Sequence, residues 1–253
     1  MSADKASPVI IVGVHRSGTS LLTRMLEKIG LFVGSDLQND HESKLIIGIN
    51  NLYFRDKNAS WDKPIYPSKK DIEANIIKGF WLENQTVIAD RFGKTEGFWG
   101  FKDPRTLTTL PLWIDLFPTA KILYIKRGPW DVAASLTSRH NMLIEKGIFP
   151  EQGDFSKGNI QFTQRCKTME GSLALALEQI RFADRLERKG VMKNHLTLSY
   201  RDLVADPLYE MSRISAYLGG AFTKRQLREA VSIPRDDTSV DAKVAMDAYF
   251  HKR

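Results

Sequence analysis

The sequence of 253 residues predicts an α/β fold: one domain, residues 1–253, with a central parallel sheet flanked by helices. Short β-branched apolar runs alternate along the chain with longer segments in which apolar residues recur every three or four positions. Strands that are separated by helices in this way form parallel sheets covered on both faces. The composition, 42% hydrophobic and 26% charged, is that of a globular chain, and no repeat or Gly/Ser-rich linker divides it.

The patterns assign the strands and helices in order. Val9–Val12 is β-branched throughout, as expected of a strand buried on both faces, and a helical pattern from Leu22 to Ile29 follows it, ended by Gly30. Further strands are expected at Phe98–Lys102, at Lys121–Lys126 and over the alternating residues Leu196, Leu198 and Tyr200. Further helices are expected through Leu110–Phe117, from about Asp131, over Phe162–Ile180, and through Leu208 and Ile214.

The charge and the cysteine content limit the class of protein. The chain has 37 Lys and Arg against 30 Asp and Glu, so its net charge is 37 − 30 = +7, which favours nucleic acid, an acidic membrane or a phosphate- or sulfate-bearing ligand. The single cysteine, Cys166, excludes an intramolecular disulfide and a cysteine-based zinc cluster. The apolar runs are too short for a membrane span, and Pro8–Val14 is too short for a signal-peptide core. We therefore expect a cytoplasmic protein without a transmembrane segment.

The turn after the first strand has the pattern of a phosphate-binding loop. Gly13 and Gly18 stand five residues apart and the hydroxyl residues Thr19 and Ser20 follow, which matches G-x-x-x-x-G-K-[ST] except for its lysine. Glycines let backbone N–H groups curl around an anion, and the start of a helix adds free donors and a positive dipole end. The alternative is a tight strand-to-helix turn that binds nothing. Thr19 stands where an ATP-binding loop needs its lysine, and the positive charge lies instead at Arg16.

Four segments resemble those of the sulfotransferases, which use 3′-phosphoadenosine 5′-phosphosulfate (PAPS). Arg16-Ser17-Gly18-Thr19-Ser20 is similar to the family's 5′-phosphosulfate loop, and Lys126–Ser135 is similar to its 3′-phosphate site. Two weaker matches are Trp99–Arg105, similar to the W-G-x-K-D-P-R segment of bacterial-type members, and Ser199–Leu203 with Asp206-Pro207. The resemblance spans residues 9–207 and implies the P-loop-like sulfotransferase architecture.

The resemblance implies a PAPS site and the residues that form it. Arg127 stands at a strand end and Ser135 eight residues on, the spacing of the family's 3′-phosphate site. An arginine fork and a hydroxyl suit a phosphate, which needs several donors at fixed angles. A helix start with Pro129 and Asp131 explains part of this segment equally well without a ligand. The PAPS-binding residues implied are His15, Arg16, Ser17, Gly18, Thr19, Ser20, Arg127, Ser135 and Tyr200.

Sulfuryl transfer to a hydroxyl or amine is an in-line displacement in which negative charge grows on the leaving phosphate. Positioning and cationic stabilisation should therefore supply most of the catalysis. We expect Arg16 and the loop amides at the leaving phosphate, and Lys102, at the end of a neighbouring strand, in the same crevice. A solvated lysine at a strand end is the alternative for Lys102. The transferred group carries one charge, so no metal is required, and the sequence has no cluster of metal-ligand type.

The resemblance does not carry over the general base of the cytosolic eukaryotic members, a His two residues after the corresponding Lys. This sequence has Pro104 at that position. Other branches of the family use a glutamate after the first helix, which makes Glu42 the preferred base, with His41 and Asp103 as alternatives. A solvated glutamate in a polar turn is the competing interpretation.

The acceptor implied by the resemblance is a carbohydrate, a glycolipid or another small molecule. We expect its site in the segments 36–92 and 138–165, where the matches are weakest. The five tryptophans could line an apolar or sugar-stacking pocket, although most fit core positions. Two other classes compete: a kinase that uses ATP and Mg²⁺, which shares the loop but lacks its lysine, and a basic nucleic-acid-binding protein. The latter rests on charge alone, because the sequence carries no nucleic-acid-binding motif. The sequence does not determine the oligomeric state.

Overall fold

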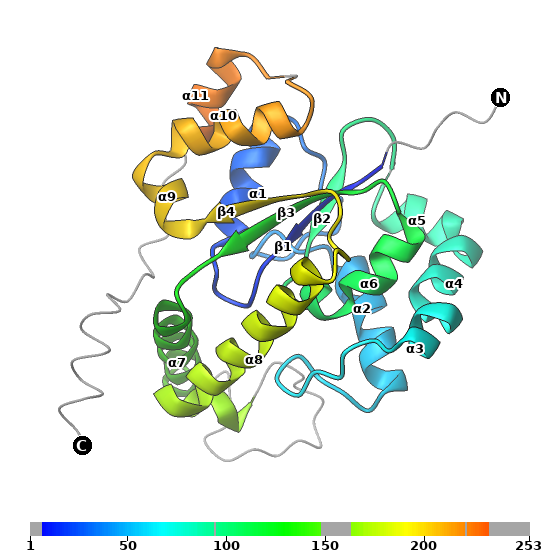
Figure 1. Cartoon of the computed structure of the whole chain (residues 1–253), viewed down its shortest axis with the longest axis vertical. Coiled ribbons are helices and arrows are strands. Elements are labelled where there is room, and N and C mark those ends of the chain that lie inside the picture. The colour runs from blue at the N-terminus through cyan, green and yellow to red at the C-terminus, as the bar shows by residue number, and fades with distance from the viewer. Residues whose placement is uncertain (1–6, 94, 148–162, 221, 233–253) are drawn as a thin grey trace.

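Four short parallel strands form the centre of the molecule, in the order β2-β1-β3-β4 (Figure 1). The computed structural model describes residues 7–93, 95–147, 163–220 and 222–232. The strands are β1 (Val9–Val12), β2 (Gly100–Lys102), β3 (Lys121–Lys126) and β4 (His195–Ser199). The predicted central parallel sheet is therefore confirmed.

Helices cover both faces of this sheet. Their bounds are α1 (Thr19–Lys28), α2 (Lys44–Asp56), α3 (Lys69–Ala74), α4 (Ile76–Glu83), α5 (Gln85–Arg91), α6 (Thr106–Leu116), α7 (Pro129–Glu145), α8 (Met169–Arg188), α9 (Tyr200–Ala205), α10 (Pro207–Tyr217) and α11 (Lys224–Val231). Figure 1 shows α1, α10 and α11 on one side of the sheet and α2, α6 and α8 on the other.

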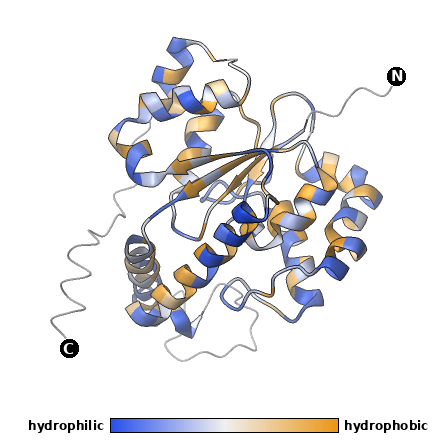
Figure 2. Ribbon diagram, viewed as in Figure 1, coloured by the Kyte–Doolittle hydropathy of each residue, from blue (hydrophilic) through white to orange (hydrophobic). Residues whose placement is uncertain are grey.

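Successive residues of β1 face opposite sides, which divides the core in two. Ile10 and Val12 pack with residues of α2, α4, α6 and α8, whereas Val9 and Ile11 pack with residues of α1, α10 and α11. All four side chains are buried, and this explains why β1 is apolar throughout rather than alternating. In Figure 2 the hydrophobic colour covers much of the central sheet, while most helices carry both colours.

Three predicted element boundaries are wrong. The strand predicted over Phe98–Lys102 begins only at Gly100. Tyr200 is the first residue of α9 and not part of the last strand, because the Ser199 side chain accepts a hydrogen bond from Asp202 N and caps a helix there. The helix predicted over Phe162–Ile180 begins only at Met169, since Thr168 is extended and caps α8 by accepting from Gly171 N. A short 3₁₀ turn, Gln164–Lys167, precedes it, and Phe162 lies outside the described residues.

The strand order brings the predicted functional segments to one edge of the sheet. β1 lies between β2 and β3, with Ile11 paired to Lys102 and Val12 paired to Tyr124. The loop after β1, the end of β2 and the end of β3 therefore meet at the carboxyl edge, where ligands bind in open parallel sheets.

Candidate functional site

The loop between β1 and α1 has the shape of an anion-binding turn. Gly18 has a φ of 102° and stands at the N-cap of α1, where no side chain caps the helix and the first turn holds no acidic residue. The first N–H groups of the helix consequently point outward at its positive dipole end. Gly13 is equally constrained, because a Cβ there would lie 2.3 Å from Ser17 Oγ and 2.8 Å from the Ile125 carbonyl oxygen.

The hydroxyl groups of this loop also fit an anion. Ser17 is fully buried, and its Oγ has no hydrogen-bond partner among the described residues. Thr19 is buried at the first turn of α1, and Ser20 Oγ accepts a hydrogen bond of 3.0 Å from Lys102 Nζ. A buried hydroxyl without a partner costs stability unless a ligand or water completes it. The loop therefore suits a phosphate-type group.

The two predicted phosphate sites are joined by direct contacts. Arg16 has a positive φ of 68°, and its Nε donates to Ser135 Oγ at 3.0 Å. Arg127 Nη1 donates to the Arg16 carbonyl oxygen at 3.1 Å, and its guanidinium lies 4.5 Å from the centre of the Tyr200 ring. Arg127 Nε is buried and has no hydrogen-bond partner in the described part of the chain. The structure thus brings together Arg16, Arg127, Ser135 and Tyr200, which lie far apart in the sequence.

An open pocket of about 580 Å³ lies beside this cluster, at the ends of β3 and β4. Its lining combines three cations with one aromatic ring and consists of Lys126, Arg127, Gly128, Asp131, Ser199, Tyr200, Arg201 and Val204. The volume is within the range of small-molecule sites. A nucleoside with a negatively charged substituent has the size and charge that this pocket suits.

Lys102 is buried, and the alternative of a solvated strand-end lysine is wrong. Its side chain is 0% exposed, and Nζ donates to Ser20 Oγ, to the Asp40 carbonyl oxygen at 2.5 Å and to Glu42 Oε1 at 2.9 Å. All three donor positions of the ammonium are used. Lys102 consequently ties the anion loop to the segment that contains Glu42.

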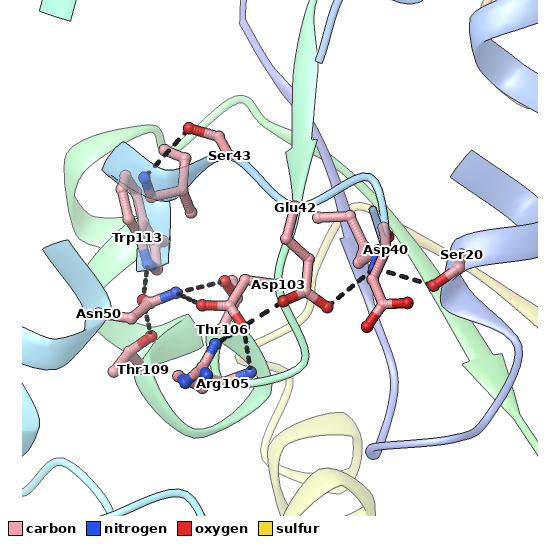
Figure 3. A network of polar contacts seen from close by, with 12 residues as sticks. Ser20, Asp40, Glu42, Ser43, Asn50, Asp103, Arg105, Thr106, Thr109 and Trp113 are labelled. Carbon is pink, nitrogen blue, oxygen red and sulfur yellow. Dashed lines mark hydrogen bonds and ion pairs between the residues drawn. The ribbon is translucent and has the colours of Figure 1, made fainter. Parts of the chain in front are cut away.

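Glu42 lies two residues before α2 and faces the cations of β2 and the following turn (Figure 3). Its Oε2 lies 3.8 Å from Arg105 Nη1, and its side chain is 12% exposed. Burial raises the pKa of the Glu42 carboxyl, although the positive charge of Lys102 opposes the shift. A carboxyl with a raised pKa and a residual opening to solvent can accept a proton in a reaction.

The two alternative bases lie in different surroundings. His41 contacts α1, with Nδ1 2.6 Å from Glu27 Oε2. Asp103 is 0% exposed, and its carboxylate accepts from Arg105 N at 3.0 Å, Arg105 Nη1 at 2.9 Å and Asn50 Nδ2 at 2.8 Å. Glu42 lines a cavity whose printed lining includes neither His41 nor Asp103.

That cavity, of about 80 Å³, lies beside Glu42. Its lining is His15, Arg16, Asp40, Glu42, Trp61, Arg105, Leu136, Arg139, His140, Leu143 and Cys166. Arg139 Nη2 pairs with Asp40 Oδ2 at 3.0 Å. The His15 ring lies 4.6 Å from Trp61, and burial together with the charges of Arg105 and Arg139 holds the pKa of His15 well below its usual value. His15 is therefore a neutral imidazole at pH 7.

Several residues of the site were not singled out from the sequence. Asn50, Asp40, Arg105 and Arg139 enter it through packing, and of these only Arg105 lay in a matched segment. In the described ranges, no group of three or more His, Cys, Asp and Glu side chains is placed to hold a metal ion. The described helices include none long and apolar enough to cross a bilayer.

The parallel sheet and the glycine loop before α1 define a P-loop-like α/β protein. Residues 8–224 match the model of the sulfotransferase family, and the chain belongs to that family. The predicted family is therefore confirmed.

Solved structures that are similar to this chain include two sulfotransferases and one sulfotransferase domain. Sulfotransferase STF9 from Mycobacterium avium is 16% identical, with 92% of this chain and 70% of that chain covered and a TM-score of 0.50. A sulfotransferase from Alicyclobacillus acidocaldarius is 18% identical, with 98% and 92% covered and a TM-score of 0.49. The sulfotransferase domain from the Synechococcus PCC 7002 olefin synthase is 20% identical, with 97% and 86% covered and a TM-score of 0.48. No curated protein matches the sequence.

Proposed function

We propose that the protein transfers a sulfuryl group from PAPS to a hydroxyl or amine of a carbohydrate, glycolipid or other small-molecule acceptor. Family membership supports sulfuryl transfer in general. The main support for PAPS as the donor is that two cations lie at the glycine loop. Arg16 lies within the loop, and Lys102 reaches Ser20 from the neighbouring strand.

The donor would occupy two connected parts of the site. The backbone N–H groups at the start of α1, with Ser17, suit the 5′ end of PAPS, because they offer free donors at a positive helix terminus. Arg127 and Ser135 suit the 3′-phosphate, and the open pocket beside Tyr200 suits the nucleoside. A nucleotide with phosphates at both ends would thereby engage both clusters.

The proposed reaction is an in-line displacement at sulfur. The acceptor oxygen or nitrogen forms a bond to sulfur, the bond from sulfur to the bridging phosphate oxygen breaks, and 3′-phosphoadenosine 5′-phosphate (PAP) leaves. The proton of the acceptor passes to Glu42. Arg16, Lys102 and the loop amides stabilise the negative charge that grows on the leaving phosphate.

The acceptor would enter the cavity beside Glu42. Both segments expected to form the acceptor site contribute to its lining: Trp61 comes from 36–92, and Arg139 and His140 come from 138–165. Residues 148–162 of the second segment lie outside the described residues. The extent of the domain over 1–253 and the cytoplasmic location stay predictions.

Retention on immobilised 3′,5′-ADP tests the donor. We expect PAPS or PAP to release the protein, with or without EDTA, and ATP with Mg²⁺ to leave it bound. Release by ATP–Mg²⁺ alone would favour the kinase alternative, and release by nucleic acid alone would favour the binding protein. A panel of carbohydrates, glycolipids, phenols and amines with labelled PAPS then identifies the acceptor.

A further inference from the structure

A fully buried asparagine lies two helical turns after Glu42. Asn50 is 0% exposed, and all four of its hydrogen-bonding positions are used (Figure 3). Its Nδ2 donates to Asp103 Oδ2 at 2.8 Å and Thr106 Oγ1 at 2.9 Å, and its Oδ1 accepts from Thr109 Oγ1 at 2.7 Å and Trp113 Nε1 at 2.8 Å. Two donated and two accepted hydrogen bonds are the full capacity of a side-chain amide.

The contacts of Asn50 continue to the candidate base. Asp103 binds Asn50 with one carboxylate oxygen and the backbone and side chain of Arg105 with the other. Arg105 Nη1 in turn lies 3.8 Å from Glu42 Oε2. A continuous series of buried polar contacts therefore runs from Asn50 through Asp103 and Arg105 to Glu42.

Asn50 also joins the two segments that set the position of Glu42. Glu42 lies two residues before the start of α2, which contains Asn50. Lys102 directly precedes Asp103, to which Asn50 is bound. A hydrogen bond between α2 and the β2–α6 connection therefore fixes how the base and its two cations meet. A shift of about 1 Å in such a geometry can lower a rate about a hundredfold.

Stability alone does not account for these buried charges. Arg105 is 5% exposed and Asp103 is 0% exposed, so both groups lose their hydration on folding. Replacing a buried ion pair by apolar residues of similar volume is often neutral or stabilising. The buried Asp103–Arg105 pair is retained next to Glu42 despite this loss of hydration. This indicates that the pair helps to position the Glu42 carboxylate.

We propose that Asn50 is a positioning residue for sulfuryl transfer, which holds the Asp103 carboxylate so that Arg105 and Lys102 face Glu42. The proposal rests on the proposed function. Asn50 touches neither the reacting atoms nor the donor site, and it acts through Asp103.

The chain offers a matched control for a substitution at this position. Asn75 is 4% exposed, and its Nδ2 donates to a carboxylate of α6, Asp115 Oδ2 at 2.9 Å, and to the Leu112 carbonyl oxygen at 2.9 Å. Asn50→Asp and Asn75→Asp therefore make the same change, a second carboxylate against an existing one. Of these two asparagines, Asn50 alone is bound to the Asp103–Arg105 pair.

The experiment compares release of PAP from PAPS, with water and with 2-naphthol as acceptors, in the wild type and in both variants. We expect kcat to fall about tenfold to a hundredfold in Asn50→Asp and to change little in Asn75→Asp. The affinity for PAP, measured by calorimetry, should stay within about twofold in both. Equal values of kcat in the two variants would overturn the proposal.

A double variant separates positioning from folding. In Asn50→Asp with Asp103→Asn the amide and the carboxylate exchange places, so the hydrogen bond between them is retained. Arg105 then loses the nearer of its two charged partners, Asp103, and keeps Glu42. We expect the double variant to regain the wild-type melting temperature and to keep the low kcat. Recovery of both quantities would show that Asn50 serves only the fold, and would overturn the proposal. A wild-type protein that neither binds PAP nor consumes PAPS would instead refute the proposed function.

Discussion

The guanidinium of Arg127 donates to the backbone carbonyl of Arg16, across 111 residues of sequence. The side chain of Arg16 in turn donates a hydrogen bond to Ser135 on α7. Two hydrogen bonds thus join the loop proposed for the 5′ end of PAPS to the residues proposed for its 3′-phosphate. Preorganised donors of this kind reduce the ordering cost of binding.

Arg127→Ala should weaken PAP binding much more than binding of adenosine 5′-phosphate, which lacks the 3′-phosphate. Loss of a charge-assisted phosphate contact costs about 1.5–3 kcal/mol, or roughly tenfold to more than a hundredfold in affinity. The 5′-only nucleotide should lose a smaller amount, because Arg127 also supports the Arg16 carbonyl. Calorimetry with both nucleotides measures the two losses. Equal losses would identify Arg127 as a structural residue.

Glu42→Gln keeps the shape of the side chain and removes its negative charge. Turnover should fall about a hundredfold or more, since general-base catalysis contributes at least that much, while PAP binding survives. His41→Gln is the control, because His41 contacts Glu27 rather than Glu42. A turnover near the wild-type rate in Glu42→Gln would move the proton transfer to another group.

The pH dependence of kcat gives a second test of Glu42. A base must be deprotonated to act, and burial raises the pKa of Glu42 against the opposing charges of Lys102 and Arg105, while Asp103 adds to the rise. The rate should therefore fall with decreasing pH at values above about 4.3, the ordinary glutamate pKa. This acidic limb of the pH profile of kcat should disappear in Glu42→Gln. A limb at the ordinary value would contradict the buried environment of Glu42.

His15 should make the protein less stable in mild acid. Its folded-state pKa is lowered well below the usual value, so the unfolded chain takes up a proton near pH 6.5 that the folded chain does not. The free energy of unfolding should decrease as the pH falls below about 6.5. Urea unfolding at pH 8 and pH 5.5 measures the decrease, which His15→Gln should reduce. Burial also lowers the pKa of His140, which should contribute to the decrease that remains in His15→Gln.

Gly18→Ala should destabilise the fold and abolish binding of PAP. A Cβ at this position would lie 2.2 Å from the Tyr200 ring, and the φ of 102° adds strain of about 1–3 kcal/mol. Gly190→Ala is the matched control, because Gly190 has a φ of 64° but no atom within 4 Å of an added Cβ. Thermal unfolding and PAP calorimetry are measured for both variants. Backbone strain should affect Gly18→Ala and Gly190→Ala alike, whereas the contact with Tyr200 should affect Gly18→Ala alone. Normal PAP binding by Gly18→Ala would contradict the assigned anion loop.

The sequence contained enough to predict the glycine loop before α1 and the sheet, because both depend on local patterns. The glycines, the β-branched strand and the helical repeat of α1 lie within residues 9–29. The burial of Lys102 could not be predicted, since it requires β2 to lie next to β1, and strand order is set by packing. The last strand was predicted one residue too long, because the cap formed by Ser199 overrides the alternation of Leu196, Leu198 and Tyr200.

The contacts of Asn50 could not be predicted from the sequence either, for a different reason. Asn50 stands on a mostly apolar helix, 53 residues before Asp103, and no local motif links the two. Such pairs form when two helices and a turn pack, so they become visible only in three dimensions. Arg139 and Asp40 pair in the same way across 99 residues.

The placement of the tryptophans gives the protein an internal optical reporter. Trp81, Trp99 and Trp113 pack together in the core, where a ligand cannot reach them, while Trp61 lies against His15 at the wall of the cavity beside Glu42. Emission from the three core indoles and from Trp130, at the start of α7, forms the background. Entry of a molecule into the cavity alters the surroundings of Trp61, so unlabelled acceptors can be screened by the intrinsic fluorescence of the protein, with Trp61→Phe as the blank.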